Sequence, residues 1–369
     1  EDFKYYFPTN DLVTAPEIMF FWVARMIMAS YEYQSLPPFR NVYFTGIVRD
    51  KQGKKMSKSL GNSPDPIELI EKYGADGVRV GMLLSSPAGN DLLFDESLCE
   101  QGKNFYNKLW NALKLLKSWE IDNNIPQPET SKTANAWFKK KFSDELEQIN
   151  SSYERFRISD ALMSSYKLAW DEFCSWYLEM IKPDYQKPID SLTINEAIEN
   201  FENVLRILHP FMPFVTEEIW HLLKKREEKT FLMTDKWAQT SAGSYDLQGF
   251  DQTKEVISAI RAIRTKRNIP NRETLVLQIA EGSRHNKTFD AVIVRLANLE
   301  KVEYIAEKPE GAVNFLVGVN EYYIPLGEKV DVAAEKKKLE EEIKYLQGFL
   351  KSVEKKLSNE RFVSNAPPQ

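Results

Sequence analysis

Three lysines lie within five residues of a loop that has a glycine at each end. The loop runs from Gly53 to Gly61 and carries Lys54, Lys55 and Lys58. A lysine ammonium is a compact charge on a flexible stem, so it can follow phosphate groups as negative charge develops on them. Glycines beside the lysines allow such a loop to move with its ligand. The pattern predicts polyphosphate binding, and its alternative is a solvated basic loop.

The order of the residues in this loop separates the two readings. Lys55-Met56-Ser57-Lys58-Ser59 spells KMSKS, and the flanks 46–50 and 60–62 extend the match. The segment resembles the signature loop of the class I aminoacyl-tRNA synthetases. The resemblance implies that Lys55 and Lys58 stabilise the transferring phosphates, with Lys58 as the first candidate. It also implies that Ser57 and Ser59 shape the loop, that Met56 packs beneath the adenine, and that Mg²⁺ arrives with ATP.

A second candidate segment is Thr14-Ala15-Pro16-Glu17. It falls where the family usually has Thr-Gly-x-Asp, whose Gly and Asp approach the ATP ribose. Here Ala15 and the longer Glu17 replace them, so Glu17 either binds the ribose hydroxyls or only closes a capping box with Thr14. The helix predicted for 18–29 is apolar on nearly every side, so we expect it to be buried. Trp22 on this helix either lines the amino-acid pocket or belongs to the core.

Further segments resemble the valyl branch of this family, and the resemblance extends over almost the whole chain. They are 20–28, 173–179, 209–214 and 216–220. The implied reaction converts L-valine and ATP to valyl-adenylate, and then transfers the valyl group to tRNA(Val). The isoleucyl or leucyl branch is the nearest alternative. The absence of any cysteine pair favours the valyl branch, because the isoleucyl enzyme often ends in a cysteine-rich zinc module. A non-catalytic RNA-binding or coiled-coil module is the alternative from another class.

Basic side chains in two regions are candidates for contacts with tRNA phosphates, which arginine and lysine commonly bind. The candidates are Arg155, Arg157, Lys167, Arg261, Arg264, Lys266 and Arg267. Each of them could instead belong to a solvated face. Asp76 and Arg79, three residues apart on a predicted helix, either pair at the surface or support the signature loop.

The elements that must position these residues predict a multidomain, mainly α-helical protein. Asp65 and Pro66 predict the start of one helix and Gly74 its end. Long amphipathic stretches between residues 95 and 267 predict a helical bundle. The alternating apolar pattern at 275–279 predicts a strand. The resemblance divides the chain into five parts. Residues 1–62 are expected to form the C-terminal part of a Rossmann-like α/β catalytic domain, and residues 63–105 a stem-contact region. An anticodon-binding bundle at 106–270 is followed by a small α/β module at 271–329 and by the first helix of a tRNA-binding coiled-coil arm at 330–369.

The last predicted helix carries an apolar seam with heptad spacing. Its positions are Val332, Leu339, Ile343, Leu346, Leu350, Val353 and Leu357. A single apolar seam requires a partner. We therefore expect residues 330–358 to pack on a neighbouring molecule or on the main body, or to be poorly ordered. The full-length protein is expected to be a monomer.

Composition sets the remaining limits. The 369 residues carry a net charge of −5, with 43% hydrophobic and 28% charged residues, as expected for a globular protein. The two cysteines, Cys99 and Cys174, form no metal-binding pair, so we expect a reducing cytoplasmic location and no structural metal. No stretch is long enough for a membrane span. The chain begins without Met, and neither the HIGH motif nor the editing domain is present, so we expect a C-terminal fragment that is inactive alone.

Overall fold

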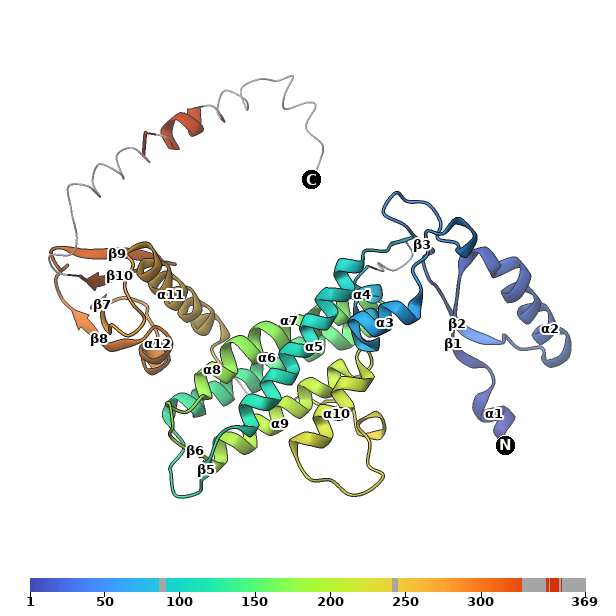
Figure 1. Cartoon of the computed structure of the whole chain (residues 1–369), viewed down its shortest axis with the longest axis horizontal. Coiled ribbons are helices and arrows are strands. Elements are labelled where there is room, and N and C mark those ends of the chain that lie inside the picture. The colour runs from blue at the N-terminus through green and yellow to red at the C-terminus, as the bar shows by residue number, and fades with distance from the viewer. Residues whose placement is uncertain (86–90, 241–244, 327–342, 345, 352, 354–369) are drawn as a thin grey trace. The chain divides into compact units, whose positions relative to one another are not determined.

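The computed structural model describes residues 1–85, 91–240, 245–326, 343–344, 346–351 and 353 (Figure 1). The chain divides into two units, Glu1–Leu247 and Gln248–Gln369. Helices predominate, as the sequence predicts. None of the helices in the described ranges is both long and apolar enough to cross a membrane.

The first unit begins with a βαβ arrangement. Strands β1 (Thr9–Thr14) and β2 (Phe39–Phe44) are parallel, and the chain crosses between them through a continuous run of helical segments. These segments are η1 (Pro16–Ile18), η2 (Met19–Val23) and α2 (Ala24–Gln34), while a short α1 (Asp2–Tyr6) precedes β1. Parallel strands require such a crossover, so the α/β character predicted for residues 1–62 is confirmed locally.

The apolar helix lies where the sequence predicts it, but the prediction that it is buried was wrong. Phe20, Phe21 and Trp22 are 77%, 70% and 58% exposed, and of the residues in η2 and α2 only Val23 and Ser30 are buried. The reason is geometric. In the described part of the chain the sheet beside this helix has only two strands, which can cover one stripe of a helix and not its whole circumference.

A second small sheet precedes the helical bundle. Strand β3 (Val48–Arg49) pairs in parallel with β4 (Leu92–Leu93), and between them lie η3 (Lys58–Leu60), α3 (Pro66–Tyr73) and α4 (Ala75–Leu84). The side chain of Asp65 accepts a hydrogen bond from the Ile67 amide at 2.7 Å, and Gly74 ends α3 with a φ of 76°. Both predicted helix boundaries are therefore confirmed.

Helices α5 to α10, coloured from cyan to yellow in Figure 1, form a bundle. Their bounds are α5 (Glu96–Lys117), α6 (Glu129–Glu154), α7 (Ile158–Lys167), η4 (Leu168–Tyr177), α8 (Leu178–Ile181), α9 (Ser191–Leu208) and α10 (Pro213–Leu223). Strands β5 (Ile121–Asp122) and β6 (Ile189–Asp190) pair at one end, and η5 (Leu232–Thr234) follows α10. Buried aromatic rings fill the core, among them Phe138, Phe173, Tyr177 and Phe201.

Glycines let α4 and α5 approach closely. A Cβ on Gly102 would lie 2.5 Å from the carbonyl oxygen of Gly77, and one on Gly81 would lie 2.6 Å from the Cys99 nitrogen. These neighbours are backbone atoms that side-chain rotation cannot move, so larger residues are excluded at both positions. The close crossing fixes the region after the signature loop against the first helix of the bundle.

The second unit contains a four-stranded sheet in the order β8-β7-β10-β9. Strands β7 (Leu275–Ala280) and β8 (Leu299–Ile305) are parallel and joined through η6 (Lys287–Phe289) and α12 (Asp290–Leu296), while β9 (Ala312–Val317) and β10 (Asn320–Pro325) form a hairpin. The alternation predicted at 275–279 is confirmed, since Leu275, Leu277 and Ile279 are buried. Helix α11 (Leu247–Lys266), which the sequence placed in the bundle, packs in this unit through Phe250 and Phe289, whose rings are 5.5 Å apart.

Candidate functional site

A clamp between Asp50 and Asn62 closes the signature loop at its base. The Asn62 amide donates to Asp50 Oδ2 at 2.8 Å, and its own Oδ1 accepts from the backbone of Ser57 at 2.9 Å. The backbone amides of Gln52 and Lys54 donate to Asp50 Oδ1 at 3.0 and 2.8 Å. Led by the bond from Asn62, these contacts lower the pKa of the Asp50 carboxyl below its ordinary value. The ionised carboxylate is thus the acceptor around which the loop turns.

The loop is also attached to the strand and to the cluster below it. The Met56 amide donates to the carbonyl of Val48 at 3.1 Å, and the Met56 side chain packs against a buried cluster that includes Leu69, Tyr73 and Phe94. In this structure Met56 therefore anchors the loop, and its predicted place beneath adenine remains a prediction. Gly53 and Gly61 have φ angles of 78° and 65°, so glycine serves the turn geometry at both ends.

The two serines of the signature contact each other. The hydroxyls of Ser57 and Ser59 lie 2.6 Å apart, and Ser57 Oγ also accepts from the Ser59 amide at 3.2 Å. This contact links the two serines, while the loop-shaping role that the resemblance implies for them stays a prediction. Lys58 begins η3, but its side chain lies outside the described residues. Its assignment as the first catalytic candidate therefore stays a prediction.

The two candidate segments meet at Lys55 and Glu17. Lys55 Nζ lies 3.0 Å from Glu17 Oε1, and both side chains are partly exposed, at 60% and 42%. The capping box proposed as the alternative for Glu17 is wrong, since Thr14 ends β1 and the residue before η1 is Ala15, which has no side-chain cap. Glu17 therefore does not cap this helical segment, and its carboxylate faces the signature loop. Trp22, more than half exposed on η2, does not belong to a core in the described chain.

Asp76 and Arg79 do not pair at the surface. Asp76 is buried, and its carboxylate accepts from the Val215 amide at 2.7 Å and from the Phe214 amide at 3.4 Å. Arg79 donates to the carbonyls of Phe211 and Pro210, both at 3.0 Å. Two residues of α4 therefore hold the turn that enters α10. Burial raises the pKa of Asp76, and the two backbone hydrogen bonds oppose this shift.

The predicted basic residues of the bundle lie near the turn between α6 and α7. Arg155 and Arg157 are exposed there, and Arg157 Nε forms an ion pair with Asp160 at 2.5 Å. Lys167 is exposed at the end of α7. These positions are accessible to a ligand. Their role in tRNA binding remains a prediction.

The predicted basic cluster of α11 divides in two. Arg264 is only 5% exposed and its guanidinium donates to the carbonyls of Ala297, Pro270, Glu273 and Asn298. The expectation that Arg264 contacts a phosphate is therefore withdrawn, because its donors are directed to backbone oxygens inside the unit. Arg261 also donates to a carbonyl, that of Leu296 at 2.9 Å, but it is exposed, as is Lys266, while Arg267 is half-buried.

Metal ligands do not gather anywhere in the described ranges, where no group of three or more His, Cys, Asp or Glu side chains has an arrangement suited to a metal ion. Cys99 and Cys174 are buried and unpaired with each other. Burial raises the pKa of the Cys174 thiol to about 12, which describes a core residue and not a reactive one.

Comparison with known families and proteins decides the relationship. Family models match residues 1–95 (tRNA synthetases class I (I, L, M and V)), residues 135–280 (anticodon-binding domain of tRNA ligase) and residues 331–369 (valyl tRNA synthetase tRNA binding arm). All of the chain aligns with valine–tRNA ligases, with 55% identity to that of Christiangramia forsetii, 54% to that of Parabacteroides distasonis and 36% to that of Chlorobaculum tepidum. The chain belongs to the valyl-tRNA synthetase family.

The chain spans 42% of the length of the first two of these valyl-tRNA synthetases and 43% of the third. Among solved structures, the LeuRS of Agrobacterium radiobacter K84, in a ternary complex with tRNA and LeuAMS, resembles it with a TM-score of 0.48 and 17% identity over 75% of this chain and 31% of that one. The structure of Mycobacterium tuberculosis methionyl-tRNA synthetase in complex with methionyl-adenylate has a TM-score of 0.47 and 20% sequence identity. That match covers 59% of this chain and 45% of the other.

Sequence reasoning treated Asp50 and Asn62 only as flanks of the signature. Both are short polar residues next to the glycine-bounded loop, and such residues commonly organise turns through backbone hydrogen bonds. That signal could have identified them as positioning residues. The contact of Asp76 with α10 carried no comparable signal, because it joins segments separated by 138 residues or more.

Proposed function

We propose that this chain is the C-terminal part of a valine–tRNA ligase, which activates L-valine with ATP and transfers it from valyl-adenylate to tRNA(Val). The observation that carries the proposal is the contact between Lys55 and Glu17. It joins the loop that the family uses for ATP phosphates to the segment that the family uses for the ATP ribose. The chain would supply this loop, with residues 63–105 contacting the stem and residues 106–270 the anticodon region.

The geometry suggests a role for each side chain of the loop. Glu17 holds Lys55 while no nucleotide is present, and the ribose hydroxyls of ATP take the place of the ammonium on the carboxylate. Lys55, with Lys58, then provides positive charge where negative charge develops on the phosphates. The clamp between Asp50 and Asn62 holds the loop closed at its base. Mg²⁺ enters with ATP as part of the substrate.

Kinetics of the full-length protein test the assignment of Lys55 and Glu17. In valine-dependent ATP–pyrophosphate exchange, Lys55→Gln should lower kcat, because its charge acts where phosphate charge develops. Glu17→Gln should mainly raise KM for ATP. The pair is exposed, so breaking it changes stability by at most about 1 kcal/mol. Lys51→Gln, which removes a neighbouring exposed charge paired with Asp95, is the control. Normal kcat in Lys55→Gln would contradict the proposal.

Binding of tRNA by the chain itself tests the other half. We expect tRNA(Val) to bind more tightly than tRNA(Ile) or tRNA(Leu) in a filter assay repeated over a salt series. Equal affinity for all three, governed by salt alone, would instead support a non-specific RNA-binding module. A preference for tRNA(Ile) or tRNA(Leu) would favour the corresponding branch. The chain alone should be inactive in ATP–pyrophosphate exchange.

A further inference from the structure

A hollow of about 520 Å³ lies on the bundle, where the chain leaves α10 and turns back across α9. We call it the α10 hollow. Its lining contains five cationic and three carboxylate side chains, together with two aromatic rings. These residues are Arg206, Lys224, Lys225, Arg226 and Lys229, Glu202, Glu227 and Asp235, and Trp220 and Phe231. The lining therefore carries two excess positive charges in a chain whose net charge is −5.

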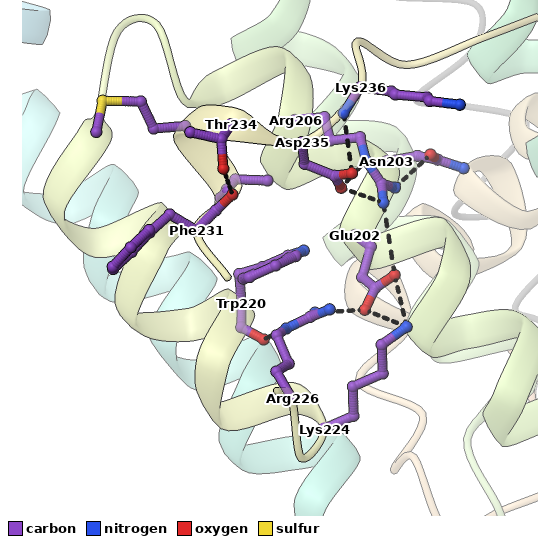
Figure 2. A network of polar contacts seen from close by, with 12 residues as sticks. Glu202, Asn203, Arg206, Trp220, Lys224, Arg226, Phe231, Thr234, Asp235 and Lys236 are labelled. Carbon is purple, nitrogen blue, oxygen red and sulfur yellow. Dashed lines mark hydrogen bonds and ion pairs between the residues drawn. The ribbon is translucent and has the colours of Figure 1, made fainter. Parts of the chain in front are cut away.

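The inner cations of the hollow are already paired. Glu202, whose side chain is 5% exposed, contacts Lys224 at 2.8 Å and Arg226 at 2.5 Å (Figure 2). Arg206 donates to Asp235 at 2.7 Å, and the guanidinium of Arg226 lies 3.1 Å from the centre of the Trp220 ring. The side chains of Glu202 and Arg226 are nearly buried, whereas Lys224 is half exposed. Each inner cation thus has a protein partner that orders the floor of the hollow before any ligand binds.

The rim is fixed as well. Leu232 is buried, and its amide donates to Glu217 at 2.8 Å. The same carboxylate lies 3.1 Å from His221, whose ring meets Phe231 edge to face at 6.3 Å. Phe231 is nevertheless 47% exposed. An exposed aromatic ring that its neighbours hold in place is a suitable surface for stacking a planar base.

Two observations indicate that the hollow has donors and cations that no described acceptor satisfies. Lys225 and Lys229 are exposed on the rim and form no ion pair with any described residue. Trp220 is 4% exposed, and its indole Nε1 finds no acceptor in the described structure. Figure 2 shows this nitrogen directed toward the centre of the polar network. A buried donor without an acceptor costs free energy, and an anion that enters the hollow reduces this cost by serving as the acceptor.

We propose that the α10 hollow binds a nucleotide, with its phosphate at Lys225 and Lys229 and its base on Phe231. We assign this nucleotide to an unpaired position of bound tRNA, an assignment that rests on the proposed function. The volume suits a single nucleotide. The carbonyl end of α10 opposes an anion, but Arg226 donates to the Trp220 carbonyl at 2.9 Å and so reduces that effect.

Charge removal on the rim provides the test. In filter binding of tRNA(Val) by the whole chain, K225Q/K229Q should weaken binding at least threefold near 0.1 M salt. The slope of log affinity against log salt should fall by about 1 to 2, since each lost phosphate contact lowers it by about 1. The matched control K132Q/K187Q removes two exposed charges elsewhere on the bundle and should change neither quantity. Equal effects of both double variants would overturn the proposal.

The base contact and the source of the nucleotide need separate measurements. Phe231→Ala should weaken tRNA(Val) binding at least threefold without changing the salt slope, because stacking involves no counterion release. Unchanged affinity in that variant would overturn the stacking contact. ATP alone is the probe for a free nucleotide. Suppose that loss of Lys225 weakens ATP binding while K225Q/K229Q leaves the affinity for tRNA unchanged. The assignment of the nucleotide to RNA is then wrong.

The two proposals can fail independently. If the wild-type chain binds all tRNAs equally but K225Q/K229Q still lowers affinity and slope, the proposed function fails and the α10 hollow remains an RNA site. If tRNA(Val) is preferred and K225Q/K229Q behaves like its control, the proposed function stands and the inference about the hollow fails.

Discussion

Asp76 caps a helix that lies far from it in the sequence. Helix α10 begins after Met212, which provides no side-chain cap, and Pro213 occupies its first turn. The carboxylate of Asp76 supplies the missing acceptor for the amides of Val215 and Phe214. Removing a helix cap costs about 0.5–2 kcal/mol, and leaving buried donors without an acceptor costs about 1–3 kcal/mol. We therefore expect Asp76→Ala to destabilise the start of α10 by about 2 kcal/mol.

Asparagine at the same position separates the acceptor from the charge. Burial raises the pKa of Asp76, so the fold holds the ionised carboxylate less favourably than water does. Asparagine keeps one acceptor oxygen and removes the charge. We expect Asp76→Asn to cost less than about 1 kcal/mol, because one hydrogen bond survives and the desolvation penalty falls.

Hydrogen exchange at the Val215 amide measures this effect directly. A loss of about 2 kcal/mol corresponds to roughly thirtyfold faster exchange, since 1.4 kcal/mol is a factor of about ten. Glu71→Ala, which removes an exposed carboxylate on the neighbouring α3, should leave the rate unchanged. Protection within threefold of wild type in Asp76→Ala would refute the capping argument. Equal losses in Asp76→Asn and Asp76→Ala would show that charge matters more than the acceptor.

Three further predictions follow from the described contacts. Asn62→Ala opens the clamp to Asp50, so trypsin should cleave the signature loop several-fold faster, and an unchanged rate would show that the clamp does not order the loop. Arg264→Met leaves carbonyl groups unpaired and should destabilise the second unit by about 3 kcal/mol, so a melting transition at the wild-type temperature would contradict this role. Burial lowers the pKa of His209 below the unfolded value near 6.5, so the folded state binds fewer protons and the free energy of unfolding should fall as pH drops below about 7. His209→Asn should flatten this pH dependence in urea denaturation, and an unchanged slope would assign it to other groups.

Local patterns predicted well where neighbouring residues decide the outcome. Asp65, Pro66 and Gly74 act on amides and φ angles within a few residues of themselves, and the structure confirms the helix they delimit. The alternation at 275–279 depends on which face of one strand is covered, and it too is confirmed. The family followed from the letters of the loop and its flanks, because a signature is a local property of the chain.

The seam predicted at 330–358 lies largely outside the described residues. Those that are described there, at 343–344, 346–351 and 353, are helical. Ile343, Leu346 and Leu350 are more than half exposed. The described part of the seam thus presents exposed apolar side chains. The packing of this segment on a neighbouring molecule or on the main body stays a prediction.

Burial and partnership were decided by tertiary structure. The all-apolar composition of 18–29 indicated a helix, yet its exposure depends on how many strands lie beside it. Arg264 and its exposed neighbour Lys266 look alike in the sequence, but only the fold brings four carbonyls around Arg264.

The KMSKS loop shows both levels together. The sequence alone determined which family the loop belongs to and which lysines it presents, because these depend on residue type and order. Only the tertiary structure decided that Lys55 faces Glu17 and that Asp50 and Asn62 close the loop. The physical reason is that side-chain contacts between distant segments depend on how the backbone packs, and no spacing of residues within one segment records that arrangement.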